Sequence, residues 1–132
     1  MYFQLLMGHL VGDYLFQSTI MATTKGQAKT LQGWLWCLLH CLIYTLSICL
    51  CLWHFDWVFF VLIFNSHFWI DKFSLAEKWA QLTGGRTFEK AAKEPDLDKR
   101  PFSIAFTCLV YVVVDNTMHL LLMWWVLSRT LV

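Results

Sequence analysis

The sequence predicts an all-α protein, a bundle of four transmembrane helices with a cluster of histidine and aspartate side chains near the bilayer midplane. The chain of 132 residues is 58% apolar and only 14% charged, whereas soluble domains are roughly 45–50% apolar and about 25% charged. Its apolar residues form four long segments that are separated by polar connections. Three of these segments carry a histidine and an aspartate four residues apart.

Composition and charge exclude several classes of protein. A chain of this length is expected to form one domain, over residues 1–132. Ten Lys and Arg and nine Asp and Glu, most of them in one stretch, are too few to cover the surface of a small soluble domain. The formal net charge of +1 does not attract a polyanion, so nucleic acid is not an expected partner. Five cysteines, an odd number, predict buried thiols rather than a disulfide framework.

The apolar segments predict the positions of the helices. They are expected at about residues 2–21, 31–53, 57–80 and 101–128. The second is the clearest, because residues 30–55 contain no Asp, Glu, Lys or Arg and ~20 apolar residues suffice to cross a bilayer. Each of the others contains an acid near its middle, namely Asp13, Asp71 or Asp115. A charge at the bilayer centre costs at least ~2.5–3.5 kcal/mol, so these acids indicate a functional site.

The basic residues predict the orientation in the membrane. A short connection with Lys25 and Lys29 follows the first helix, and a charged loop over residues 83–100 precedes the last. Because Lys and Arg are enriched in cytoplasmic loops, both connections are expected in the cytoplasm and both termini outside it. The chain is therefore expected to be a multi-pass membrane protein, with membrane lipid as its partner.

The ionisable residues inside the helices form a pattern typical of a metal site. Residues at i and i+4 share a helix face, so each His/Asp pair points at one spot, and the second helix adds one more histidine. The seven candidate ligands are His9, Asp13, His40, His67, Asp71, Asp115 and His119. Imidazole and carboxylate suit zinc, manganese or iron. Seven ligands exceed one tetrahedral zinc and favour two ions bridged by an aspartate. The expected cofactor is one or two divalent transition-metal ions, with zinc in first place.

Other polar residues near this pattern suggest supporting roles. Gln17 and Tyr44 continue the polar faces of the first and second helices, and Asn116 follows Asp115, so these three are expected around the ligands. Lys72 either orients an anionic substrate or only extends its ammonium towards the membrane surface. Arg86, after two glycines, either holds a phosphate group or belongs to a charged cytoplasmic turn.

Several motifs resemble a known family. The run His-Leu-Val-Gly-Asp-Tyr-Leu-Phe-Gln at residues 9–17 resembles the opening of the family called domain of unknown function 3307, small bacterial and phage membrane proteins. The resemblance continues at residues 39–40, 66–72 and 115–119. Tyr44 stands where the family often has a second histidine, and Asn116 where it often has glutamine. The resemblance implies a bacterial inner membrane.

The His/Asp pattern of that family is similar to that of membrane-bound metal-dependent hydrolases. The similarity implies hydrolysis of an amphipathic substrate, such as a phospholipid or a polyprenyl phosphate, by water activated on the metal. Asp71 or Asp115 would then be the catalytic base, and Lys72 or Arg86 would bind the anionic group of the substrate.

The pattern leaves three alternatives open. The same cluster suits a metal or proton pathway, for which four helices would need to form a homo-oligomer. It also suits a metal-free network of His–Asp pairs. Finally, the metal would only stabilise the fold if protein ligands filled all of its coordination positions.

Overall fold

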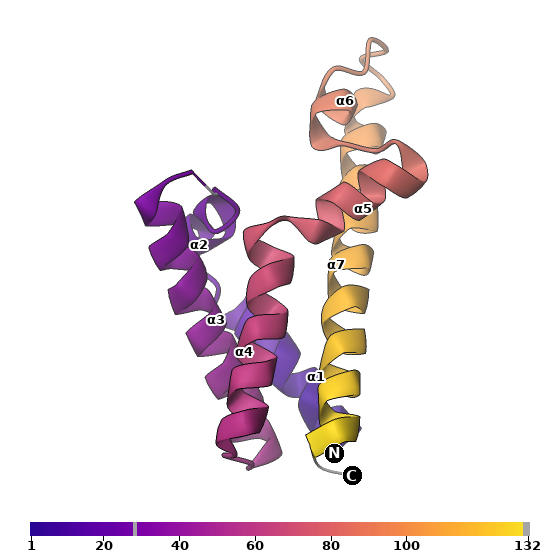
Figure 1. Cartoon of the computed structure of the whole chain (residues 1–132). Helices are drawn as coiled ribbons and strands as arrows, with labels where there is room; N and C mark the ends of the chain where they lie inside the picture. Colours follow the sequence, from indigo (N-terminus) through magenta and orange to yellow (C-terminus); the bar gives the residue numbers. More distant parts are fainter. Residues whose placement is uncertain (28, 131–132) are drawn as a thin grey trace.

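The computed structural model describes residues 1–27 and 29–130 and contains only helices among its regular elements (Figure 1). The all-α prediction is confirmed. The elements are α1 (Tyr2–Leu10), a π-helical turn η1 (Val11–Leu15), α2 (Thr19–Thr24), α3 (Leu31–Leu52), α4 (Trp57–Lys72), α5 (Leu75–Gly84), α6 (Phe88–Ala92) and α7 (Arg100–Thr130).

Side-chain caps determine where four of these helices begin. Ser18, Thr30, Asp56 and Thr87 precede α2, α3, α4 and α6, and each side-chain oxygen accepts a hydrogen bond from the backbone amide three residues later. The N···O distances are 2.9–3.3 Å. Such caps satisfy amides that the first helical turn leaves without a partner.

The first predicted helix, over residues 2–21, is interrupted in the structure. α1 passes into η1, where the amide of Phe16 donates to the carbonyl of Val11 at 3.0 Å, and Ser18 then begins a separate helix. The helical stretch from Tyr2 to Leu15 is at most about 21 Å long, shorter than the ~30 Å hydrocarbon core of a bilayer. The prediction of one transmembrane helix here is therefore not confirmed.

The third predicted helix, over residues 57–80, is bent. The chain bends by 54° between α4 and α5. Ser74, at the bend, has a φ of 48°, a left-handed conformation that a straight helix does not contain. The described residues thus contain two helices long and apolar enough to span a membrane, α3 and α7, or three if α4 and α5 form one bent span. The fourth expected span, over residues 2–21, is not among them.

The helices nevertheless surround a common interior. α1 packs on α3, α3 on α4 and α4 on α7, while α7 also contacts α1. α5 and α6 pack on the first half of α7 (Figure 1). The start of α1 and the end of α7 lie at one end of the molecule, together with the turn between α3 and α4, whereas α6 lies at the opposite end (Figure 1).

Two glycines allow the N-terminal segment to lie directly on α3. A Cβ atom on Gly8 would lie 2.9 Å from the Cα of Ile48, and one on Gly12 would lie 2.9 Å from the Cα of Tyr44. Small residues four apart are a common means of close helix packing in membranes. This close approach brings the side chains of His9 and Asp13 against α3.

The outer surface is largely apolar. Along α7, Leu109, Val113 and Leu121 are each more than half exposed. A soluble monomer seldom exposes a continuous apolar surface of this kind, whereas lipid tails cover it favourably. Together with the two or three candidate spans, this surface indicates a membrane protein.

Candidate metal centre

Four parts of the bundle direct ionisable side chains to one place. η1 contributes Asp13, α3 contributes His40, and α4 and α7 each contribute a His/Asp pair. Six of the seven candidate ligands fall into three groups whose ligand atoms lie within 4.8 Å of one another. These groups are Asp13, His67 and His119; His40, His67 and Asp71; and Asp71, Asp115 and His119. All except the half-buried Asp115 are buried.

The atoms at the centre have the spacing of metal ligands. His40 Nε2 and His67 Nε2 are 3.0 Å apart. They lie 3.1 and 3.2 Å from Asp71 Oδ2, and 3.2 and 3.4 Å from Asp13 Oδ1. Around a tetrahedral ion with bonds of ~2.0–2.1 Å, neighbouring ligand atoms are about 3.3–3.4 Å apart. The five distances are close to this value, and His40, His67 and Asp71 form one of the three groups.

Asp71 connects this group to a second one. Its Oδ2 atom faces His40 and His67, whereas its Oδ1 atom lies 3.5 Å from His119 Nε2. His119 Nε2 in turn lies 3.7 Å from Asp115 Oδ1. A carboxylate with one oxygen in each group has the arrangement of a bridging ligand.

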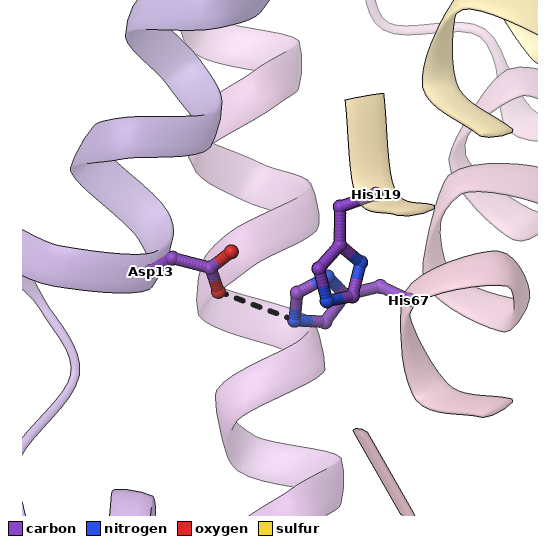
Figure 2. A group of neighbouring side chains, drawn as sticks. All are labelled: Asp13, His67 and His119. Atoms are coloured by element: carbon purple, nitrogen blue, oxygen red, sulfur yellow. Dashed lines mark ion pairs between the residues drawn. The ribbon is translucent and has the colours of Figure 1, made fainter. Parts of the chain in front are cut away.

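Several buried atoms of the cluster lack a hydrogen bond. Within the described ranges, Asp13 Oδ1, His67 Nδ1 and His119 Nε2 have no hydrogen-bond partner of acceptable geometry. Figure 2 shows these three side chains converging from different segments, with the ion pair between Asp13 and His67. Leaving such atoms buried without a partner is costly, and a bound cation would satisfy Asp13 Oδ1 and the lone pair of His119 Nε2.

The structure adds Lys25 to the cluster, a residue that the sequence patterns do not indicate. Lys25 Nζ lies 2.7 Å from Asp71 Oδ2 and 3.3 Å from His40 Nε2. Burial by itself would lower the pKa of Lys25, but the charges of Asp71 and Asp13 outweigh it and hold this pKa above its ordinary value. A single lysine in a basic connection has no periodic relation to the His/Asp pairs, so nothing in the sequence distinguishes it.

The charges of the cluster do not balance. In the described part of the chain, Lys25 is the only Lys or Arg that contacts these carboxylates. With neutral histidines, three aspartates and one ammonium leave a formal charge of −2, which is expensive in a buried site. One divalent cation would neutralise it.

His9 is the one candidate ligand that belongs to none of the three groups. Its Nε2 lies 2.8 Å from Asn116 Oδ1, and its Nδ1 lies 3.0 Å from the Tyr44 hydroxyl and 3.1 Å from Asp13 Oδ2. Because both ring nitrogens are engaged, neither faces the groups around Asp71. His9 thus orients Asp13.

The three polar residues expected around the ligands do contact the cluster. Tyr44 stacks on the ring of His67 with centroids 3.6 Å apart, and Asn116 accepts from His9. With its amide oxygen turned towards Lys25, Gln17 accepts from the ammonium at 2.6 Å and donates to the carbonyl of Asp13 at 2.9 Å. Such contacts fix the orientation of metal ligands.

The two residues proposed to hold an anionic substrate lie elsewhere. Lys72 is fully buried, and its ammonium donates to the carbonyls of Lys25 and Gln27 at 3.4 and 3.2 Å. Arg86 lies over the ring of Phe106, in a separate cavity between α6 and α7. Neither lines the cavity beside the cluster, and the roles expected for them in binding substrate stay predictions.

A cavity of about 160 Å³ adjoins the cluster. It is lined by Asp13, Tyr14, Gln17, Ala22, Lys25, Tyr111, Val112 and Asp115. One water molecule needs only ~10–15 Å³ of such space, so several waters or a group of the size of a phosphate fit. Two carboxylates of the cluster and its ammonium therefore reach a space that a small polar group can enter.

The contacts of His9 predict how its substitution changes metal binding. His9→Ala should weaken divalent metal binding about tenfold to a hundredfold without changing the number of bound ions, because residues that orient ligands have effects of this size. Metal titration of the detergent-purified protein measures this. Complete loss of one ion in His9→Ala, as in His67→Ala, would show instead that His9 is a ligand.

Comparison with known proteins places the chain in one family. No curated protein and no solved structure matches it. The match to the family described as Protein of unknown function (DUF3307) extends over residues 1–132, so it covers every segment that contributes to the cluster. The chain is a member of the DUF3307 family.

Proposed function

We propose that the protein is a membrane-embedded, metal-dependent hydrolase that acts on an amphipathic substrate with a phosphorylated headgroup. The observation that carries the proposal is the convergence of Asp13, His40, His67 and Asp71 at ligand spacing in a buried, negatively charged site. The site would hold one or two divalent ions, with zinc in first place; His40, His67 and Asp71 would hold one, and Asp71, Asp115 and His119 a second.

The aspartates differ in the roles that they can take. A divalent ion held by these residues would lower the pKa of water to about 7 and stabilise negative charge on the substrate. Asp71 is enclosed by Lys25, His40, His67 and His119, and its side chain is 2% exposed, so it serves as a ligand. The side chain of Asp115 is 17% exposed and lines the cavity, which makes it the better candidate for the general base.

The surroundings of the cavity support an amphipathic substrate. An apolar groove of about 310 Å³ lies between α5 and α7, lined by Trp79, Val113, Val114, Thr117, Met118 and Leu121. Val112 and Asp115 of the polar cavity lie on the same stretch of α7. The headgroup and the chain of a lipid would then contact different faces of α7, the headgroup beside the cluster and the chain beside α5.

Hydrolysis of a phosphorylated lipid in detergent micelles tests the function. We expect the zinc- or manganese-loaded protein to release inorganic phosphate from short-chain phosphatidic acid, and chelation to abolish this activity. Asp115→Asn should keep its metal but lose about 10²–10⁴-fold in rate, the usual contribution of a general base.

The matched control is Asp98→Asn, which changes an exposed aspartate in the loop before α7 and should hydrolyse at the wild-type rate. Activity that survives chelation, or that is unchanged in Asp115→Asn, would contradict the proposal. Zinc or manganese flux into proteoliposomes without hydrolysis would favour transport instead.

We also propose that both termini lie outside the cytoplasm in a bacterial inner membrane. This topology needs four crossings, so the short segment of α1 and η1 would have to cross together with the three candidate spans. The start of α1 and the end of α7 share one end of the molecule (Figure 1), and the Lys/Arg-rich loop before α7 belongs to the other. A C-terminal alkaline phosphatase fusion should therefore be active, and a C-terminal green fluorescent protein fusion dark. The opposite pair of results would reverse the topology.

A further inference from the structure

Lys25 occupies the place of a cation in the cluster. An ammonium has three N–H donors, and here they meet three acceptors, Asp71 Oδ2 at 2.7 Å, His40 Nε2 at 3.3 Å and Gln17 Oε1 at 2.6 Å. Asp71 Oδ2 and His40 Nε2 are also two of the atoms with metal-ligand spacing. The ammonium and a metal ion at this position would therefore use the same ligand atoms.

The ammonium of Lys25 leaves part of the negative charge and some polar atoms of the cluster without a partner. It carries one charge against three carboxylates, and it makes no hydrogen bond to Asp13 Oδ1 or His119 Nε2, which lack such partners in the residues that the structure describes. A divalent ion carries twice the charge and accepts lone pairs from nitrogen and oxygen alike. It would therefore compete effectively with Lys25 for Asp71 and His40.

The ammonium has a second place to go. Lys25 follows α2 directly, and its side chain is among those that line the cavity beside the cluster. Its own backbone carbonyl is held by the ammonium of Lys72 at 3.4 Å. The flexible four-carbon side chain can turn into the cavity while this contact keeps the backbone in position.

We propose that Lys25 occupies the metal position in the metal-free protein, and that a bound divalent ion displaces its ammonium into the adjoining cavity, where it binds the phosphate group of the substrate. This inference rests on the proposed function and specifies its substrate class, an anionic phosphate ester. The formal charges agree with it. Three carboxylates, one divalent ion and one ammonium sum to zero, and a second divalent ion leaves the positive charge that a phosphate dianion neutralises.

Metal titration tests the competition. Zinc binding to the purified protein in detergent should be at least tenfold tighter in Lys25→Met than in the wild type, because no ammonium has to leave Asp71. Lys25→Arg, which keeps the charge, should bind zinc as weakly as the wild type or more weakly. Lys29→Met is the matched control, since Lys29 is an exposed lysine in the same connection, and it should bind zinc like the wild type.

Anion binding tests the second position of the ammonium. Inorganic phosphate should bind the zinc-loaded wild type and Lys29→Met, and should bind zinc-loaded Lys25→Met at least tenfold more weakly. Dihexanoyl phosphatidic acid forms the second arm. If the natural ligand is a lipid phosphate, it should bind more tightly than inorganic phosphate, and lose affinity in Lys25→Met by a similar factor. Equal affinities for both would indicate a free phosphate ester.

The outcomes separate this inference from the proposed function. Equal zinc affinity in the wild type and Lys25→Met would overturn the role of Lys25 and leave the metal site in place. Unchanged phosphate binding in Lys25→Met would likewise overturn its second position. If Lys25→Met binds zinc and the wild type does not, the ammonium of Lys25 excludes the ion completely, which would support the competition. No zinc, manganese or iron in any of these proteins would overturn the proposed function and this inference with it.

Discussion

Asp71→Asn is expected to abolish metal binding and hydrolysis together. The substitution keeps the size of the side chain but removes the charge that faces Lys25, His40, His67 and His119. Because two of the three groups of ligands contain this residue, we expect at least a hundredfold loss of zinc affinity. Metal content after gel filtration measures the effect, with Asp98→Asn as the control. Wild-type metal content in Asp71→Asn would show that the ion does not bind at Asp71.

The same substitution should also lower stability in the absence of metal. It leaves the largely buried ammonium of Lys25 without its closest anion, and breaking a buried ion pair from one side costs about 3–5 kcal/mol. Thermal unfolding followed by tryptophan fluorescence detects this change. Adding Lys25→Met to Asp71→Asn should recover part of the stability but none of the metal. If the double variant is no more stable than the single one, the ion pair does not account for the loss.

Gly12→Val is expected to separate the N-terminal segment from α3. The new Cβ would lie 2.8 Å from Tyr44 Cδ2 and 2.9 Å from Tyr44 Cα. The backbone of a packed transmembrane helix cannot move aside as a side chain can. We therefore expect the free energy of unfolding to fall by about 1–3 kcal/mol or more. Displacing η1 also moves Asp13 away from His40, which weakens metal binding. Unfolding temperature and zinc affinity measure both effects.

Gly84→Ala is the control for this substitution, because the added Cβ would meet only the flexible side chain of Arg86. It should unfold and bind zinc like the wild type. An equal and small effect of both substitutions would show that α1 and η1 do not lie as close to α3 as the structure places them.

The sequence predicts the parts of the site that depend on local periodicity. A His/Asp pair four residues apart shares a helix face wherever the helix lies, so the pairs in α4 and α7 could be predicted without the tertiary structure. The same holds for the apolar length of α3, which exceeds the width of a bilayer core. His40 could be assigned to the cluster because few polar residues interrupt that segment.

The remainder depends on tertiary contacts that leave no periodic signal. His9 and Asp13 have the same spacing as the other pairs, but Asn116 and Tyr44 engage both nitrogens of His9. Lys25 enters the cluster only because α2 turns back beside α3. The helix is interrupted at η1 although residues 2–21 are apolar enough for one continuous helix, so the sequence pattern does not reveal the interruption. Glycines four apart in an apolar segment, as at positions 8 and 12, do indicate close packing, but the spacing alone does not tell which helix they contact.

Metal content tests the central claim most directly. Inductively coupled plasma mass spectrometry of the detergent-purified wild type should find about one or two divalent transition-metal ions per chain, as the number of ligands suggests. His40→Ala/His67→Ala should lose the ion that these two residues share, whereas His54→Ala should retain the wild-type content, because His54 lies at the turn before α4 and outside the three groups. No metal in the wild type after reconstitution with zinc, manganese and iron, or equal metal in the double variant, would contradict the account.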